Sequence, residues 1–214
     1  MRQNPSFTLQ DPEELKRLVR ENPWVTLVST TPDGMVASHY PVILDESREE
    51  LTILSHVGRP DEAIHGLGSS EVLVIVQGPH GYISPGWYDA NPAVPTWNFV
   101  VAHLYGVPEL LSDEENYRVL GRLVDVFEDP LPEPRRMEET PANAEYAQRI
   151  SGGTVGFRLT PTRVVAKSKL SQNKPAAVVD TVIEQLEGDG PYAQPALAAE
   201  MRRVHTRLRA ARNG

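Results

Sequence analysis

A series of short β-rich runs separated by turn residues places the strongest constraint on what this chain can fold into. Residues 24–30 and 35–43 flank the turn TPDG, a pattern typical of a β-hairpin. Six or seven strands spaced in this way predict an antiparallel β-barrel with helices outside it, a mainly β fold with flanking helices (α+β). The remaining runs are 51–56, 71–78, 96–110 and 154–170, the last broken by Pro161.

Helix signals lie before, between and after these runs. Asp11 followed by Pro12 is a favourable helix start, and Ser112 with Glu115 has the spacing of a capping box. Two helices are expected near the end of the chain, in the segments PAAVVDTVIEQLE and QPALAAEMRRVHTRLRAARN.

The segments expected to lack long helices or strands are rich in turn-forming residues. Residues 57–70 predict a loop with one helical turn at 61–66, and residues 129–153, rich in Pro, Glu and Arg, are expected to be the least ordered. The alternation of strands and helices typical of a doubly wound sheet is missing. The Gly-containing segment GLGSS lacks the lysine of a phosphate-binding loop.

The length of 214 residues suits one domain with an appendage. We expect a barrel domain over residues 1–187 and an Arg-rich helical extension over 188–214. No run approaches the roughly 20 apolar residues of a membrane-spanning helix, and the N-terminal residues lack the apolar core of a signal peptide. A cytoplasmic location without membrane contact is therefore expected. The chain has no cysteine, which excludes disulfides.

Charge is distributed unevenly along the chain. Residues 1–200 hold 16 Lys and Arg against 29 Asp and Glu, whereas residues 201–214 hold five Arg and no acid. An acidic body repels a phosphate backbone, so any contact with DNA would have to involve residues 201–214. The alternative is a solvated helix face whose cations lie near the helix C-terminus, where they are mildly stabilising.

The stretch GYISPGWYDANPAVPTWNFVVAH, residues 81–103, combines two of the three tryptophans with three prolines. Prolines restrict a loop and lower the entropy cost of ordering it, and Trp and Tyr offer flat surfaces with one polar tip each. One interpretation is a rigid loop that caps a barrel end. The other is a preformed wall for a planar ligand such as a flavin, with amides from Asn98 and the later segment KLSQNK beside Trp97.

Three segments resemble the signature segments of the PaiB-like family, FMN-binding proteins often described as negative transcriptional regulators. They are GYISPGWY (81–88), VPTWNF (94–99) and KLSQNKP (169–175), and the resemblance covers roughly residues 5–185. It implies a split β-barrel of the flavin-reductase and pyridoxamine-phosphate-oxidase type, with FMN at the interface of a homodimer. The chain departs from the family at Pro60 and Asp61, where Asn-Pro is expected.

In similar split barrels the flavin phosphate is held at the end of the strand that corresponds to residues 51–56. The resemblance therefore points to Arg59 as the main phosphate-binding residue, assisted by His56 and Ser55, because the dianion needs cations and hydroxyl donors. The alternative is that His56 ends a strand and Arg59 is solvated.

The strand at residues 35–43 is expected to run under the flavin ring. Neighbouring residues of a strand face opposite sides, and we favour Ser38 and Tyr40 as the pair that faces FMN. His39 would then be a core or interface histidine.

Lys169, Gln172 and Asn173 form a compact polar group after a predicted strand. Amides can bond the pyrimidine edge of a flavin, and a cation there stabilises the anionic reduced ring. The alternative is a helix N-cap formed by Ser171 or Asn173.

Trp97, Tyr88 and Trp87 are candidates for the ring wall and the dimer contact, with core packing as the alternative. The histidines have no HxH or HExxH spacing, so no zinc site is predicted. No nucleophilic triad is recognisable either.

Three functions compete. The first is an FMN-binding homodimer that acts as a negative transcriptional regulator, with DNA contact through residues 201–214 or indirect action, since no basic helix-turn-helix is recognisable in the matched region. The second is an FMN-dependent oxidoreductase that uses NAD(P)H, or acts on heme, at the dimer interface. The third is a structural dimer that has kept the fold without the cofactor.

Overall fold

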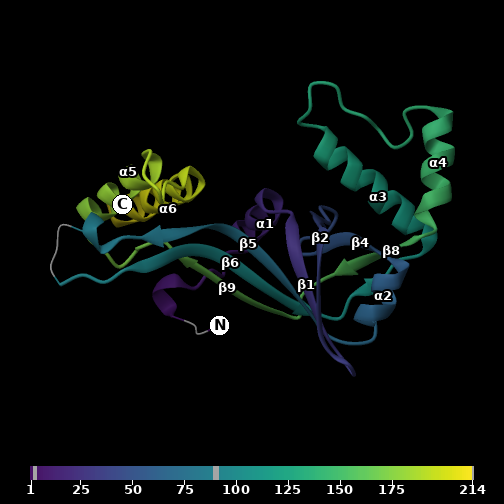
Figure 1. Ribbon diagram of the computed structural model, residues 1–214, viewed down its shortest axis with the longest axis horizontal. Helices are drawn as coiled ribbons and strands as arrows, with labels where there is room; N and C mark the ends of the chain where they lie inside the picture. Colours follow the sequence, from purple (N-terminus) through teal and green to yellow (C-terminus); the bar gives the residue numbers. More distant parts are fainter. Residues whose placement is uncertain (2–3, 89–91, 214) are drawn as a thin grey trace. The chain divides into compact units, whose positions relative to one another are not determined.

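The computed structural model describes residue 1 and residues 4–88 and 92–213, which form two compact units (Figure 1). Unit 1 consists of Met1–Gln10, Gln77–Val101 and Ala166–Gly214, and unit 2 consists of Asp11–Val76 and Ala102–Val165. The chain passes between the units within three of its strands, so each unit is built from segments that are far apart in the sequence.

Two sheets account for the strands of the described residues. The larger has the order β2-β1-β5-β6-β9 and the smaller the order β3-β4-β8-β7, and the paired strands of known register are antiparallel. The prediction of antiparallel sheets with flanking helices is confirmed. The strands are β1 (Trp24–Thr31), β2 (Gly34–Pro41), β3 (Ile43–Leu44), β4 (Ile53–Gly58), β5 (Val72–Ile83), β6 (Thr96–Gly106), β7 (Glu109–Leu110), β8 (Thr154–Leu159) and β9 (Arg163–Lys169).

The helices begin at capping residues that are visible in the sequence. Asp11 accepts a hydrogen bond from the backbone of Glu13 (3.0 Å) at the start of α1, and Ser112 and Glu115 form a reciprocal capping box at the start of α3. No helix of the described residues is long and apolar enough to cross a bilayer. The helices are α1 (Pro12–Glu21), α2 (Arg59–His65), α3 (Asp113–Glu128), α4 (Pro141–Ser151), α5 (Ala176–Glu187) and α6 (Pro195–Asn213), with 3₁₀ turns η1 (Pro5–Phe7) and η2 (Pro85–Trp87).

Three expected elements differ from the structure. Residues 129–153 contain α4, whose first turn is capped by the Thr140 side chain accepting from the backbone of Asn143 (3.1 Å). Residues 59–65 form a complete short helix, where a single turn was expected. No side chain caps α5, which begins after Pro175, so the alternative of a helix N-cap at Ser171 or Asn173 is wrong.

The core of unit 2 lies where α3 covers the smaller sheet. Ile43, Leu54, Leu111, Val119 and Leu123 form one buried apolar cluster. Close approach of α3 to β8 depends on Gly156, because a Cβ there would lie 2.9 Å from Asn116 Oδ1. β1 and β2 form the predicted hairpin, with Gly34 at φ 116° in the turn.

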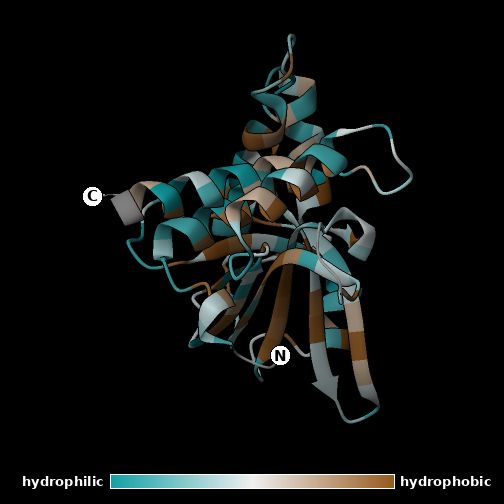
Figure 2. Ribbon diagram, turned by 90° about the vertical axis from the view of Figure 1, so that its left-hand side faces the viewer, coloured by the Kyte–Doolittle hydropathy of each residue, from teal (hydrophilic) through white to brown (hydrophobic). Residues whose placement is uncertain are grey.

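The core of unit 1 lies between α5, α6 and the strands that they cover. Hydrophilic and hydrophobic residues alternate along the helices (Figure 2), and the buried ones include Val179, Val182 and Ile183 of α5 and Leu197 and Met201 of α6. Much of the expected 188–214 extension is thus packed within unit 1. The predicted boundary at residue 187 stays a prediction.

Candidate functional site

The residues predicted to bind FMN fall into two groups, and each group lies within one unit. Unit 2 holds Ser38, Tyr40, Ser55, His56 and Arg59, and unit 1 holds Tyr88, Trp97, Asn98, Lys169, Gln172 and Asn173.

Arg59 is the first residue of α2 and follows β4 directly. Its backbone N–H donates to Gly153 O (3.0 Å), its Nε to Gly152 O (2.7 Å) and its Nη2 to Asp113 Oδ1 (3.1 Å). The side chains of Arg59 and Asp113 are 48% and 89% exposed. An ion pair this exposed contributes at most about 1 kcal/mol, so a bound dianion could compete with Asp113 for the guanidinium.

Ser55 and His56 are adjacent in β4 and face opposite sides of the strand. The hydroxyl of Ser55 is fully buried and donates to Pro41 O (2.6 Å). His56 is half-buried, its Nδ1 is buried without a hydrogen-bond partner among the described residues, and burial lowers its pKa. Because of this alternation, the two side chains do not converge on one group within a single chain.

Ser38 and Tyr40 of β2 point to the same side, toward α2, as strand alternation predicts. Tyr40 donates to Asp61 Oδ2 (2.5 Å), and burial together with this hydrogen bond raises the pKa of Tyr40 to about 12. Ser38 Oγ lies 2.9 Å from His65 Nε2, and the other ring nitrogen of His65 lies 2.9 Å from Ser29 Oγ. The β2 group is therefore held by α2.

Sequence reasoning missed Asp61 and His65 as partners of the β2 residues. They are four residues apart on a helix and so share one face. Recognising α2 as a full helix would have paired them.

His39 lies on the other side of β2, where it is exposed and stacks on Trp24, with ring centroids 6.4 Å apart. The prediction of a core histidine is wrong, because only the Ser38 side of β2 faces the interior of unit 2. The alternative of an interface histidine stays a prediction.

Lys169 is the cation of the unit 1 group. At the end of β9, its Nζ donates to Thr96 Oγ1 and to Trp97 O (2.9 Å). Burial and the nearby charge of Lys167 lower its pKa. An ammonium group has three donors, and two of them fix Lys169 against the first residues of β6.

Trp97 presents a flat apolar surface to solvent, with 55% of the residue exposed. Tyr82 meets it edge-on at 6.1 Å, and Tyr192 lies 4.8 Å from Tyr82. These rings border an open cavity of about 200 Å³. Trp97 is therefore exposed beside this cavity, and its role as a wall for a planar ligand stays a prediction.

Tyr88 is buried at the end of η2, and burial raises its pKa. The Nζ of Lys174 lies 4.9 Å from the centre of its ring, within range of a cation–π interaction. Trp87 is half-buried in η2. Residues 89–91, in the middle of the aromatic stretch, lie outside the described residues.

Asn98 is fully buried, in contrast to its neighbour Trp97. Its Nδ2 donates to Ser171 Oγ (2.9 Å) and to Met201 Sδ (3.4 Å). Ser171 is the one non-glycine residue of the described chain with positive φ, 64°, so Asn98 holds the loop after β9 in a strained conformation.

Gln172 closes the same loop on itself. Its Nε2 donates to Ser168 O (2.6 Å) and its Oε1 accepts from the backbone of Leu170 (2.7 Å). Asn173 is exposed. Of the three polar residues predicted after β9, Lys169 and Asn173 thus retain free polar capacity, and Gln172 mainly shapes the loop.

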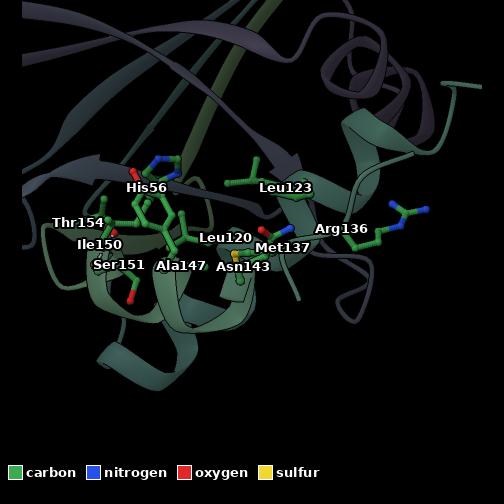
Figure 3. A pocket seen from close by; sticks show the side chains of 12 residues that line it. His56, Leu120, Leu123, Arg136, Met137, Asn143, Ala147, Ile150, Ser151 and Thr154 are labelled. Atoms are coloured by element: carbon green, nitrogen blue, oxygen red, sulfur yellow. Dashed lines mark hydrogen bonds between the residues drawn. The ribbon is translucent and has the colours of Figure 1, made fainter. Parts of the chain in front are cut away.

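A second cavity, of about 430 Å³, lies in unit 2 between α3 and α4 (Figure 3). Apolar side chains form most of its wall. It is lined by His56, Leu120, Leu123, Val124, Arg136, Met137, Asn143, Tyr146, Ala147, Ile150, Ser151 and Thr154. Among the described residues, no three His, Asp or Glu side chains cluster as metal ligands do.

Residues 1–163 match the model of a family described as "Putative FMN-binding domain". The chain is also 31% identical over 184 residues to the Protease synthase and sporulation protein PAI 2 of Bacillus subtilis, which covers 86% of this chain and 87% of the relative.

Solved structures with a similar fold are less similar in sequence. The FAD and heme binding protein of Mycobacterium smegmatis has a TM-score of 0.57 at 16% identity, covering 86% of this chain and 81% of that one. The flavocytochrome Anf3 of Azotobacter vinelandii has a TM-score of 0.53 at 16% identity, covering 76% and 69%. These likenesses concern the fold, which is the flavin-binding split β-barrel predicted above.

Proposed function

We propose that this chain, which belongs to the FMN-binding family that it matches over residues 1–163, is a flavin-binding homodimer. It would act as a negative transcriptional regulator. Membership of this family indicates that the cofactor of the chain is FMN or a related flavin. The observation that carries the proposal is a fixed cation, Lys169, bonded to the backbone carbonyl of Trp97, whose side chain is exposed.

The chemistry at Arg59 fits the phosphate of FMN. The guanidinium is half-exposed, is anchored to the backbone of Gly152, and gives its remaining contact to an exposed carboxylate. Hydrogen bonds from a guanidinium to a phosphate are charge-assisted and stronger than those from a guanidinium to a neutral acceptor. Arg59 would therefore hold the phosphate, with Asp113 displaced.

The chemistry in unit 1 fits the ring. Trp97 offers an apolar face, and Lys169 and Asn173 offer donors for carbonyl oxygens at the pyrimidine edge. Tyr88 and Gln172 support the surrounding loops from within. These are the two kinds of surface that an isoalloxazine presents, one apolar and one hydrogen-bonding.

When bound, a flavin supplies electron- and hydride-transfer chemistry. Lys169 would stabilise negative charge at the pyrimidine edge, because its ammonium is fixed by Thr96 and Trp97 and does not need to reorganise. Trp97 would exclude water from one face of the ring. The role of Lys169 favours the reduced, anionic form of the cofactor over the oxidised form.

A homodimer accounts for candidate residues in both units, since one chain could supply the phosphate end and its partner the ring end. The resemblance to PaiB-like proteins supports this arrangement. Two apolar residues at opposite ends of the β1–β2 hairpin, Trp24 and Met35, are also 64% and 81% exposed.

Regulation through an indirect route fits the C-terminal helix better than direct contact with DNA. Arg202 pairs with Glu187 (2.8 Å), and Arg209 pairs with Asp180 (2.6 Å). Arginines that already form ion pairs with carboxylates gain less free energy from counterion release on binding DNA phosphates than unpaired arginines do. The regulatory action would then rest on the flavin-dependent state of the dimer.

An FMN-dependent oxidoreductase is the second candidate. The cavity of about 200 Å³ beside Trp97 favours it, because Tyr82 and Tyr192 provide further aromatic surface where a second planar ring could lie. Bleaching of the bound flavin by NADPH without oxygen, at turnover rates, would support this function over a purely regulatory one.

The proposal is tested by titrating flavin-free protein with FMN and, separately, with riboflavin, which lacks the phosphate. Saturable binding of both is expected, with FMN bound more tightly. Arg59→Ala should weaken FMN by about 1.5–3 kcal/mol, the range for a hydrogen bond to a charged group, and leave riboflavin unchanged.

Arg118→Ala is the matched control, because Arg118 is also an exposed arginine paired with an exposed acid, Glu114 (2.7 Å). It should leave both affinities at their original values. Failure of either flavin to bind would remove the proposal, and an Arg59→Ala variant with unchanged FMN affinity would remove the phosphate assignment.

A further inference from the structure

The cavity between α3 and α4 has the size of a ligand pocket. Its volume is about 430 Å³, and α3, α4, β4 and β8, which contribute its wall, all belong to unit 2 (Figure 3). Small-molecule pockets span roughly 300–1,000 Å³. The cavity is open to solvent, and its volume falls within this range.

Facing sides of the two helices leave this space open. α3 contributes Leu120 and Val124, and α4 contributes Ala147 and Ile150. A helix that simply closed the core would carry a large side chain at the position of Ala147, which is buried but small. Ile150 remains 52% exposed at the cavity, so apolar surface stays open to solvent at a cost in stability.

One wall of the cavity carries an unused polar group. His56 reaches it from β4, and its Nδ1 is buried without a partner among the described residues. More than about 90% of buried polar groups in proteins have a hydrogen-bond partner. Burial lowers the pKa of His56, so the imidazole is neutral near pH 7, and it can offer one donor and one acceptor.

The charge at the cavity is already balanced. Arg136 lies at the lining, where its guanidinium bonds Asp125 Oδ1 (3.2 Å) and Asp129 Oδ1 (2.5 Å). An anionic ligand would have to displace these carboxylates, and a cationic one would meet Arg136. Neither charge is therefore favoured over a neutral ligand.

We infer that this cavity is a second ligand site, which takes a neutral, mainly apolar small molecule whose one hydrogen-bonding group meets His56. The apolar wall excludes the FMN phosphate. Of the three residues predicted to hold that phosphate, Arg59 and Ser55 do not line the cavity. His56, which faces the other side of β4 from Ser55, is assigned to this cavity instead. The site goes beyond the proposed flavin function and does not depend on it.

Equilibrium dialysis of the full-length, flavin-loaded protein tests the site with two probes, 2-acetylnaphthalene and 2-ethylnaphthalene. They share the apolar ring system, and only the ketone accepts a hydrogen bond. Both should bind saturably, at one molecule per chain. Ala147→Phe, which fills the cavity, should weaken both probes at least tenfold.

Ala142→Phe is the matched control: the same change on the same helix at an exposed position outside the cavity. It should leave both affinities unchanged. His56→Leu keeps the wall apolar and removes the polar group, so it should weaken the ketone severalfold and leave the hydrocarbon unchanged. This variant keeps the test valid if Ala147→Phe does not fold.

Three results would overturn the inference. The first is binding of either probe that does not saturate. The second is equal loss of affinity in Ala142→Phe and Ala147→Phe. The third is a His56→Leu variant that binds the ketone as well as the unmodified protein does.

Discussion

His65 joins three elements through its two ring nitrogens. It ends α2, lies 2.9 Å from Ser29 of β1 and 2.9 Å from Ser38 of β2, and is almost fully buried. A neutral imidazole donates from one nitrogen and accepts at the other, and each serine hydroxyl can complete either bond. His65 thereby fixes the rotamer of Ser38, a candidate flavin contact.

Burial of His56 and His65 makes stability depend on pH. Burial lowers the pKa of both, and the charge of Asp61 partly opposes the effect at His65. Their stabilising contribution is present above the unfolded pKa of about 6.5 and is lost as pH falls toward the lower folded values, because unfolding then takes up protons. The urea concentration at the unfolding midpoint should therefore decrease as the pH is lowered from 7.5 to 5.5.

His103 is a third histidine whose pKa burial lowers. His56→Leu removes one of the three and should flatten this dependence. His39→Gln, which removes an exposed imidazole, is the matched control and should keep the original slope. Carboxylates such as Asp45, whose pKa is lowered, lose their contribution only at lower pH and do not confuse the comparison. A midpoint in the unmodified protein that is flat over this range would contradict the assignment.

At the scale of elements, α6 fixes the loop that follows β9. His205 Nε2 lies 2.8 Å from Leu170 O in a buried position, and Met201 contacts Asn98. His205→Leu leaves that carbonyl buried without a partner, which should lower the free energy of unfolding by about 1–3 kcal/mol. Denaturant unfolding measures the change.

His205→Gln keeps a side-chain donor and should recover part of this loss. Thr206→Ala, at the exposed neighbouring position, should stay within about 0.5 kcal/mol of the original. Equal stabilities of the His205→Leu and Thr206→Ala variants would show that α6 does not anchor the loop.

The same contacts decide how DNA binding should be examined. Deleting residues 201–214 removes buried Met201 and His205 together with the arginines, so a loss of DNA binding in that truncation would be ambiguous. Substituting Arg202 and Arg209 by Gln removes charge and leaves the buried face of α6 intact.

Helices and strands were predictable from the sequence where their capping residues and their alternation of apolar and polar residues are local. The capping box at Ser112, the cap at Asp11 and the hairpin turn before Gly34 each depend on residues within one turn, and the structure has all three. α4 was missed because its first turn lies in a Pro- and Glu-rich segment and its buried face is small, with Ala147 the one buried apolar residue.

The site was predictable only as far as single residues. Motifs indicated Arg59 and Lys169, but their partners come from distant segments: Gly152 lies 93 residues from Arg59, and Thr96 lies 73 residues from Lys169. Strand alternation alone could have shown that Ser55 and His56 face opposite sides. That His56 would line a cavity under α4 could not be foreseen without predicting α4.

At the scale of the whole molecule, the chain exposes apolar surface that a monomer would leave in water. β2 is an edge strand of the five-stranded sheet, and Met35, at its start, is 81% exposed. Edge strands are usually covered or charged, because their unpaired backbone groups can pair with another chain. The predicted homodimer would cover this edge and supply flavin contacts from two chains.

If the hairpin forms the dimer contact and the flavin lies there, dimerisation and FMN binding must be linked. FMN then strengthens dimerisation by the same factor by which dimerisation strengthens FMN binding. Sedimentation at micromolar concentration should show a dimer, and FMN should tighten it. Met35→Glu should favour the monomer and weaken FMN binding, since it places a charge in the contact. Leu131→Glu, at an exposed apolar residue between α3 and α4, should change neither. A monomer that binds FMN fully at micromolar concentration would refute the interface site, because a single chain would then suffice to hold both ends of the cofactor.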